Sequence, residues 1–267
     1  LMKESTYEDD SLVQEPGTLE VSDVSFAYPG GERIYEDFNL SATPGQIIGV
    51  TGAVACGKST LGKTFLCEYP YEGRICFHGK ELSGMTKAEQ NGMVGYLGHD
   101  PELFNDSVRN NILLGDDDDP EKYLKAVCFD GEVAEMEEGM DTIVGNSGVR
   151  LSGGQAQRLA LARILCHKRP VLILDDPFSA LDRKTEKEVF ANLRKLTADS
   201  IVILLSHRLY LFPQMDQVLW MEDGKVTAGT HEQILEKFPE YARLYEAQAD
   251  GADAHSTQEG GLDHAEK

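Results

Sequence analysis

The chain has 267 residues, of which 46 are acidic and 25 basic, and its formal net charge is −21 at pH 7. Because phosphate backbones attract clusters of Lys and Arg, this balance argues against a nucleic acid as partner. The hydrophobic content of 41% is enough for one large α/β domain with a subdomain. The five cysteines form no CxxC pair, so they indicate neither a disulfide framework nor a zinc site.

The two ends of the chain are polar. Residues 1–18 are acidic and are predicted to be a linker, and residues 249–267 are predicted to be a disordered acidic tail. No apolar run approaches the roughly 18 residues that a membrane-spanning helix needs, and no basic-then-apolar signal peptide is visible. The first residue, Leu1, suggests a piece of a longer polypeptide, although Met2 is an alternative start. Residues 19–248 are therefore predicted to form the ordered domain.

Strand-like and helix-like patterns alternate within this domain. Residues 19–26 and 46–51 are predicted strands, and residues 58–67 a helix. Two further runs, Val171–Leu174 and Ile201–Leu205, are apolar at every position, which is typical of strands buried on both faces of a parallel sheet. Residues from about 100 to 158 are richer in acidic and helix-forming types. They predict a helical subdomain inserted between the strands.

Residues 52–59 (GAVACGKS) match the phosphate-loop pattern G-x-x-x-x-G-K-[ST] between a predicted strand and a predicted helix. Backbone N–H groups of such a loop turn inward around phosphate oxygens, and the helix N-terminus adds partial positive charge. Lys58 can reach the outer phosphates, and the Ser59 hydroxyl can bind Mg²⁺. Cys56 is interpreted as a small residue that fits the loop, with a reactive thiol as the alternative.

Two adjacent acids, Asp175 and Asp176, end the apolar run VLIL. In a protein with a phosphate loop, an acid at this end of a strand holds Mg²⁺, which is the role predicted for Asp175. Asp176 would then face the water that attacks the terminal phosphate. The alternative is that these acids only cap a turn or helix, as Asp often does.

A second glycine motif, Leu151–Gln155 (LSGGQ), precedes a run with Leu159, Ala162 and Leu165 at helical spacing. Serine and two glycines at a helix N-terminus predict a second anion site. The chain therefore either binds two ligands or offers the second site to a nucleotide held by a partner.

Taken together, these motifs resemble those of the nucleotide-binding domain of ATP-binding cassette (ABC) transporters of the exporter type. The resemblance covers residues from about 19 to 248: residues 52–60 resemble the Walker A loop, 151–155 the signature, 171–176 the Walker B strand and 179–182 the D-loop. It implies a RecA-like P-loop NTPase fold of the α/β class. That fold has a parallel-sheet core, an N-terminal antiparallel β subdomain and a helical subdomain.

The resemblance also implies roles for single residues. Lys58, Asp176 and His207, the switch histidine, take the catalytic positions. Magnesium ligation falls to Ser59, Asp175 and His99, the last in the Q-loop position. The residues implied to contact ATP are Tyr28, which stacks on adenine, and Gly52, Ala53, Val54, Ala55, Cys56, Gly57, Lys58, Ser59, Thr60, Ser152, Gly153, Gly154 and Gln155.

The implied cofactors are ATP and Mg²⁺, and the implied partner is a second nucleotide-binding domain. In the family two such domains meet head to tail, so that each ATP lies between one Walker A loop and the other signature. This would explain the two phosphate sites. The resemblance further implies transmembrane domains fused on the N-terminal side, and a location on the cytoplasmic face of the cell membrane.

Three positions depart from the family pattern. Asp176 stands where the family has the catalytic Glu and is one methylene shorter, so its carboxylate would fall short of the water. His99 replaces a Gln, although Mg²⁺ prefers oxygen ligands. Ala55 replaces the middle glycine of the loop, which is tolerated if its φ stays negative.

The departures favour the degenerate half of a heterodimeric exporter over a homodimer. Such a half binds ATP, hydrolyses it poorly, and completes the partner's ATP site with its signature. The alternative for Asp176 is that it still acts as a slow base. The alternative is a regulatory ATP-binding module without turnover. A third hypothesis, a DNA-repair or chromosome-type ATPase, is disfavoured because no heptad array separates the phosphate loop from the signature.

Overall fold

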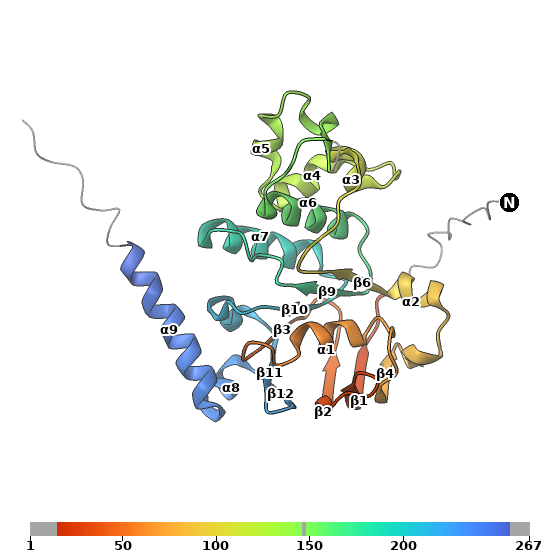
Figure 1. Ribbon diagram of the computed structural model, residues 1–267, viewed down its shortest axis with the longest axis vertical. Coiled ribbons are helices and arrows are strands. Elements are labelled where there is room, and N and C mark those ends of the chain that lie inside the picture. Colours follow the sequence, from red (N-terminus) through yellow and green to blue (C-terminus); the bar gives the residue numbers. More distant parts are fainter. Residues whose placement is uncertain (1–14, 146–147, 257–267) are drawn as a thin grey trace, which may run out of the picture.

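A ten-stranded sheet runs through the molecule in the computed structural model, which describes residues 15–145 and 148–256. Its strand order is β5-β4-β1-β2-β12-β11-β3-β10-β9-β6, with helices on both sides (Figure 1). This is the predicted α/β class with a large, mostly parallel core. The strands are β1 (Leu19–Ala27), β2 (Arg33–Ala42), β3 (Ile47–Gly52), β4 (Glu72–Phe77), β5 (Lys80–Glu81), β6 (Val94–Leu97), β9 (Val171–Asp175), β10 (Ile201–Leu205), β11 (Gln217–Glu222) and β12 (Lys225–Gly229).

The five strands β6, β9, β10, β3 and β11 form the parallel part of this sheet. On β9 successive side chains enter two different cores: Leu172 and Leu174 join one cluster, and Val171 and Ile173 the other. Alternation of this kind follows from the pleat of a strand, whose side chains point to opposite faces in turn. The prediction that β9 and β10 are buried on both faces is confirmed, since all their residues are buried.

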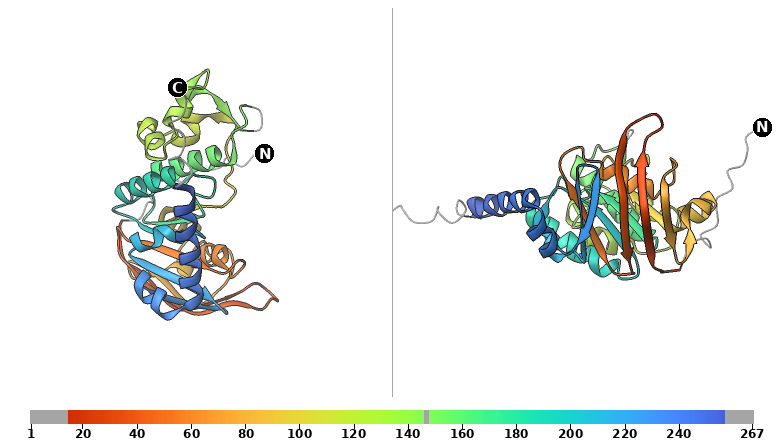
Figure 2. Two further views of the ribbon diagram at one scale, coloured as in Figure 1. Left: turned by 90° about the vertical axis from the view of Figure 1, so that its left-hand side faces the viewer. Right: turned by 90° about the horizontal axis from the view of Figure 1, so that it is seen from below.

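The N-terminal strands β1, β2, β4 and β5 are antiparallel. They do not form a separate sheet, because β2 pairs with β12 at Glu36 and Lys225 and so continues the core. Seen from below, these strands lie side by side with the core (Figure 2). The pairing brings Tyr28, just after β1, to the same region as the phosphate loop.

Helices α1 and α2 follow β3 and β5 along the chain. Helix α1 (Lys58–Thr64) begins at the loop lysine and ends three residues before the predicted Cys67. The chain turns there, because Cys67 has a φ of 51°, which cannot continue a right-handed helix. Helix α2 (Lys87–Met93) is preceded by the short 3₁₀ helix η2 (Leu82–Gly84).

The region from about 100 to 158 forms the end of the molecule farthest from the antiparallel strands (Figure 1). It is largely helical, as predicted, but it also holds a two-stranded sheet that the acidic composition did not reveal. Its elements are β7 (Asp106–Ser107), α3 (Val108–Leu113), α4 (Pro120–Ala126), α5 (Asp130–Ala134), η3 (Gly139–Asp141), β8 (Ile143–Val144) and α6 (Gly153–Cys166).

The C-terminal part packs α7 (Arg183–Leu196), η4 (Leu209–Gln214) and α8 (His231–Lys237) around the sheet. The last helix, α9 (Pro239–Ser256), contacts α8 and η4. This helix includes residues 249–256, so the prediction of a disordered tail is wrong for that segment. A helix that has already begun gains one hydrogen bond per added residue, and this segment is rich in Ala, the best helix former.

The rest of the predicted tail, 257–267, and residues 1–14 of the predicted linker lie outside the described residues. Trp220 is buried in the core. None of the helices in 15–145 and 148–256 is both long and apolar enough to cross a membrane.

Candidate functional site

The phosphate loop joins β3 to α1 and depends on two glycines with no room for a side chain. A Cβ on Gly52 would lie 2.4 Å from the Met221 carbonyl oxygen, and one on Gly57 would lie 2.5 Å from Ile34 Cγ2. Gly57 also has a φ of 101°, a conformation that other residues rarely adopt. The loop is therefore a close-fitting backbone cradle at the N-terminus of α1.

Lys58 lies over this loop with only 8% of its surface exposed. Its Nζ donates to the carbonyl oxygens of Gly52 at 3.2 Å and Ala53 at 3.0 Å, and lies 3.7 Å from Cys56 Sγ. The ammonium group thus stays where the loop backbone can direct it toward a bound anion. A cavity of about 270 Å³ opens beside it, lined by residues 55–60 and His207. The structure therefore brings the predicted switch histidine to the phosphate loop.

Ala55 does not meet the condition on which its tolerance was predicted. Its φ is +64°, inside the left-handed region that costs a residue with a Cβ roughly 1–2 kcal/mol. The loop path requires this value, so the alanine is held there by the rest of the fold. Its neighbour Val54 is 86% exposed, with its side chain left in solvent at the tip of the loop.

Asp175 ends strand β9 and is 8% exposed. The Tyr96 hydroxyl donates to its Oδ2 at 3.3 Å, from the neighbouring strand β6. Burial and the nearby carboxylate raise the pKa of Tyr96, so this hydroxyl remains a donor. The sequence analysis missed this partner. The position of Tyr96 three residues before His99 in a strand parallel to β9 was the signal that could have found it.

Asp176 follows with an unusual backbone and a carboxylate that is only partly satisfied. Its φ is +50°, which Asp tolerates better than most residues, and its N–H donates to the Leu205 carbonyl oxygen at 2.8 Å. Its Oδ1 is buried and has no hydrogen-bond partner among the described residues. Burial raises the pKa of Asp176, against the opposing influence of His207 and His99. This carboxylate is therefore placed to accept a proton.

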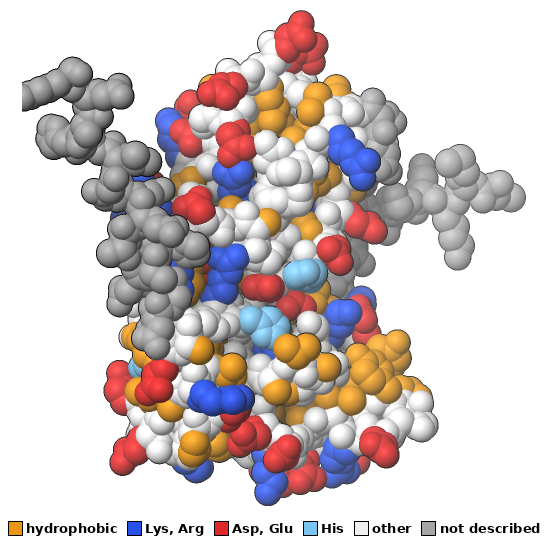
Figure 3. All heavy atoms as spheres, turned by 60° about the vertical axis from the view of Figure 1, so that its left-hand side comes forward, with side chains coloured by type: hydrophobic (Ala, Val, Ile, Leu, Met, Phe, Trp, Pro, Cys, Tyr) orange, Lys and Arg blue, Asp and Glu red, His pale blue; other side chains and the backbone are white. Residues whose placement is uncertain are grey.

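His207 lies beyond β10, and burial, followed by the charge of Lys58, lowers its pKa. Its imidazole is therefore neutral near pH 7. Both His207 and His99 act electrostatically on Asp176, so the three predicted residues lie near one another. On this side of the molecule two histidine side chains flank acidic ones in the middle of the face (Figure 3).

The predicted magnesium ligands differ in how well they suit the ion. Asp175 and Ser59 offer oxygen atoms at the end of β9 and in the first turn of α1, which is the donor type that Mg²⁺ prefers. His99 offers only ring nitrogens and fits less well. Within residues 15–145 and 148–256, His, Cys, Asp and Glu nowhere gather in threes as a metal site.

Tyr28 lies beside the loop with 38% of its surface exposed. Its hydroxyl is 3.3 Å from Thr60 Oγ1, and its ring meets that of Phe26 edge-on at 5.1 Å. A second exposed aromatic, Tyr69, lies edge-on at 5.3 Å. Sequence reasoning missed Tyr69, because no motif or periodicity marks the turn after α1. Together these contacts hold the Tyr28 ring beside the loop.

The signature motif forms the N-terminus of α6 and is closed by its own side chains. Ser152 Oγ accepts from the Gln155 N–H at 3.2 Å, and Gln155 Oε1 accepts from the Ser152 N–H at 2.9 Å, a capping box. Gln155 Nε2 also donates to Glu132 Oε2 at 2.7 Å. None of the signature residues lines the cavity at the phosphate loop. The two predicted phosphate sites are thus separate within one chain.

Comparison with known proteins identifies the arrangement. The ABC transporter family model matches residues 35–179, more than half of the chain. The chain is 35% identical over 243 residues to a probable multidrug resistance ABC transporter ATP-binding/permease protein of Bacillus subtilis, covering 88% of this chain and 42% of that one. It is 38% identical over 237 residues to an ATP-dependent lipid A-core flippase of Pseudomonas syringae, covering 86% and 40%.

Among solved structures, a bacterial Atm1-family ABC exporter with ATP bound superposes with a TM-score of 0.81 at 29% identity, covering 89% of this chain and 43% of that one. The chain spans less than half the length of these relatives. The phosphate loop, the strand-end acids and the signature agree with this match. The chain therefore belongs to the ABC transporter family, as an ATP-binding domain similar to those of exporters.

Proposed function

We propose that this chain powers an exporter from the cytoplasmic face of the membrane, as the unequal partner of a second ABC nucleotide-binding domain. The names of its relatives include a permease and a flippase, and the chain matches only part of each. Transmembrane domains fused on the N-terminal side would supply the remainder. ATP would close the two domains head to tail, because each chain has one phosphate loop and one separate signature.

In this proposal the loop amides and Lys58 bind the ATP phosphates, and Tyr28 stacks on the adenine. Ser59 and Asp175 would hold Mg²⁺, while the ring nitrogens of His99 fit the ion less well. When bound, Mg²⁺ neutralises part of the phosphate charge. The neutral imidazole of His207 lines the same cavity as Lys58 and can hydrogen-bond there.

The single observation that carries the proposal is the state of Asp176. Its buried, unpartnered Oδ1 and raised pKa suit a base. However, its N–H bond to Leu205 and its left-handed backbone anchor it to the end of the sheet, so the main chain cannot advance to offset the missing methylene. A misplacement on the order of 1 Å can cost about 10²-fold in rate. We infer binding with weak hydrolysis.

The Asp176→Glu variant tests this inference. Its longer side chain should raise ATP turnover by self-associated chains at least about tenfold, because general bases contribute 10²–10⁴-fold when well placed. The dissociation constant for ATP should stay within about twofold, since the loop amides and Lys58, rather than Asp176, are proposed to bind the phosphates. Turnover is followed by phosphate release, and ATP affinity by titration calorimetry.

Asp175→Glu is the matched control, because the same methylene at the neighbouring position displaces a magnesium ligand and should lower turnover. Robust turnover by the unaltered chain, equal to that of the Asp176→Glu variant, would contradict a degenerate site. The alternative, a regulatory module, predicts tight ATP binding without phosphate release in both chains. The left-handed Ala55 and the imidazole at position 99 favour that alternative as the second candidate.

A further inference from the structure

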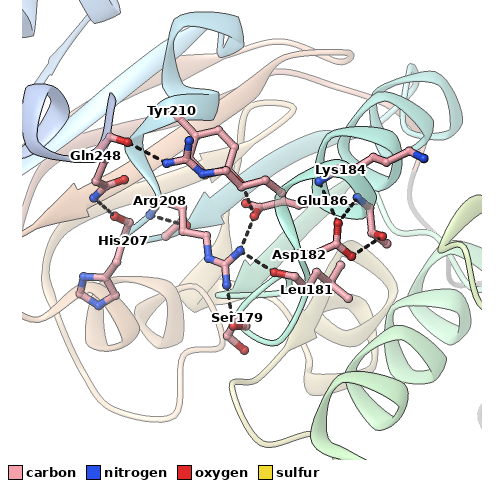
Figure 4. Close-up of polar contacts among 12 residues, drawn as sticks. Ser179, Leu181, Asp182, Lys184, Glu186, His207, Arg208, Tyr210 and Gln248 are labelled. Carbon is pink, nitrogen blue, oxygen red and sulfur yellow. Dashed lines mark hydrogen bonds and ion pairs between the residues drawn. The ribbon is translucent and has the colours of Figure 1, made fainter. Parts of the chain in front are cut away.

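Arg208, the residue after the switch histidine, connects two loops that lie far apart in sequence (Figure 4). Its guanidinium donates to the carbonyl oxygens of Ser179 at 2.6 Å and Leu181 at 2.9 Å, and forms an ion pair with Glu186. Glu186 is fully buried and also accepts from the Tyr210 hydroxyl. The segment 206–210 and the loop 179–182 are thus held together by one side chain.

Gln248, on the C-terminal helix α9, forms hydrogen bonds with the backbone on both sides of Arg208. Its Nε2 donates to the His207 carbonyl oxygen at 2.8 Å, and its Oε1 accepts from the Leu209 N–H at 2.8 Å. One amide therefore fixes the main chain before and after Arg208, because its NH₂ group donates and its carbonyl oxygen accepts.

A second contact holds the same turn of α9 in place. Arg183, at the start of α7, donates to the Gln248 carbonyl oxygen at 2.7 Å, and its guanidinium lies 4.5 Å from the centre of the Tyr210 ring. The C-terminal helix is therefore joined to three segments at once: the histidine loop, η4 and the first turn after the loop 179–182. Figure 4 shows these contacts as one chain from Gln248 to Ser179.

We propose that Gln248 is a positioning residue, through which the C-terminal helix sets the main chain at His207 and, by way of Arg208, the loop 179–182. The proposal deepens the proposed function and rests on it where His207 acts on ATP. Gln248 touches only the backbone of His207 and leaves the imidazole free to face the phosphate-loop cavity. Without the two bonds the segment would gain alternative backbone positions, and His207 would occupy its productive one less often.

The experiment compares Gln248→Ala and Gln248→Glu with the unaltered full chain, and Glu246→Ala on the same helix is the control. Amide hydrogen exchange is measured first, without nucleotide. Gln248→Ala should increase exchange at Leu209, whose N–H loses its acceptor, and at Ser179 and Leu181 through Arg208. Gln248→Glu still accepts from Leu209 but cannot donate to His207, so it should keep the protection of Leu209 alone.

Turnover is then measured in the Asp176→Glu background, where the proposed function predicts measurable hydrolysis. Gln248→Ala should lower kcat about tenfold with KM for ATP changed less than twofold, because small misplacements act on the chemical step. Glu246→Ala should leave both unchanged. A merely structural role would lower the melting temperature and the active fraction, so kcat is calculated per ATP-binding chain, counted by titration calorimetry, and would then be unchanged.

Unchanged exchange at Ser179 and Leu181 in Gln248→Ala would overturn the proposal, as would an unchanged kcat where the background hydrolyses ATP. The two proposals fail in different ways. An Asp176→Glu chain that binds ATP without phosphate release defeats the proposed function, while the exchange measurement still decides whether Gln248 positions the two loops.

Discussion

The sequence predicts phosphate sites at two helix N-termini, those of α1 and α6, and these termini differ in whether a side chain caps them. Helix α1 starts after Gly57, which has no side chain to cap it, so its first N–H groups are available to a ligand. Helix α6 starts after Ser152 and is closed by a capping box. In the proposed function the open terminus would bind the phosphates of the chain's own ATP, whereas the capped terminus would face a nucleotide held by the partner.

The largest effect should come from Lys58→Ala at the open terminus. The lysine is the cation held at this loop, and losing charge-assisted hydrogen bonds to phosphate should weaken ATP binding by about 10- to 100-fold. Lys63→Ala, an exposed lysine on the same helix, is the control and should bind ATP normally. Titration calorimetry gives both constants. Equal affinities would mean that the loop amides alone hold the phosphates.

Ser152→Ala tests the capped terminus and should act on stability before it acts on ATP. Loss of the cap costs about 1 kcal/mol, while ATP binding by the isolated chain should not change. Ser152→Asp retains a cap but places negative charge where a partner's phosphate would lie. We expect it to restore the melting temperature and still impair partner-dependent turnover. If it restored turnover too, the motif would serve only to cap α6.

Ala55→Gly should remove the strain at the open terminus. Glycine adopts a φ of +64° without cost, so the variant should gain up to about 1 kcal/mol, or roughly 2–4 °C in Tm for a chain of this size. Ala53→Gly is the matched control, because Ala53 has a negative φ and glycine there only adds entropy to the unfolded chain. Calorimetric melting curves compare the two. A lower Tm for Ala55→Gly would contradict the strain.

The smallest expected effects are on the pH dependence of stability, which should differ between His207 at the phosphate loop and Glu132 at the signature. Burial lowers the pKa of His207 below its ordinary 6.5, so the folded chain binds fewer protons there, and stability is lost as the pH falls below about 6.5. Burial opposes a lower pKa at Glu132, yet hydrogen bonds from Gln155 and Arg158 bring it below 4.5, and that stability is lost only in acid below about 4.5.

Urea unfolding at each pH separates these two contributions. His207→Gln should flatten the change in unfolding free energy between about pH 7 and 5, and Glu132→Gln should flatten it below about pH 4.5. The other limb of each profile should follow that of the unaltered chain. If both variants altered the same limb, the two regions would not titrate independently.

The sequence predicted the local structure of the phosphate loop well, because that structure depends on residues adjacent in the chain. The glycines at 52 and 57, the lysine and the helix after them occupy the positions that the motif implies. Ala55 was misjudged because a backbone angle depends on the path that Met221 and Ile34 impose from other strands. Residues 249–256 were misjudged because helix propagation from Pro239 outweighs a weak periodicity.

By itself, then, the sequence determined the α/β class, the two glycine motifs and the acids at the end of β9, since each follows from spacing along a few residues. Only the tertiary structure decided which residues form hydrogen bonds with them. The Tyr96 hydroxyl on Asp175, the Leu205 carbonyl oxygen on the Asp176 N–H and the Gln248 amide on the His207 main chain join residues separated by many positions. Their meeting depends on strand order and helix packing, which no short pattern records.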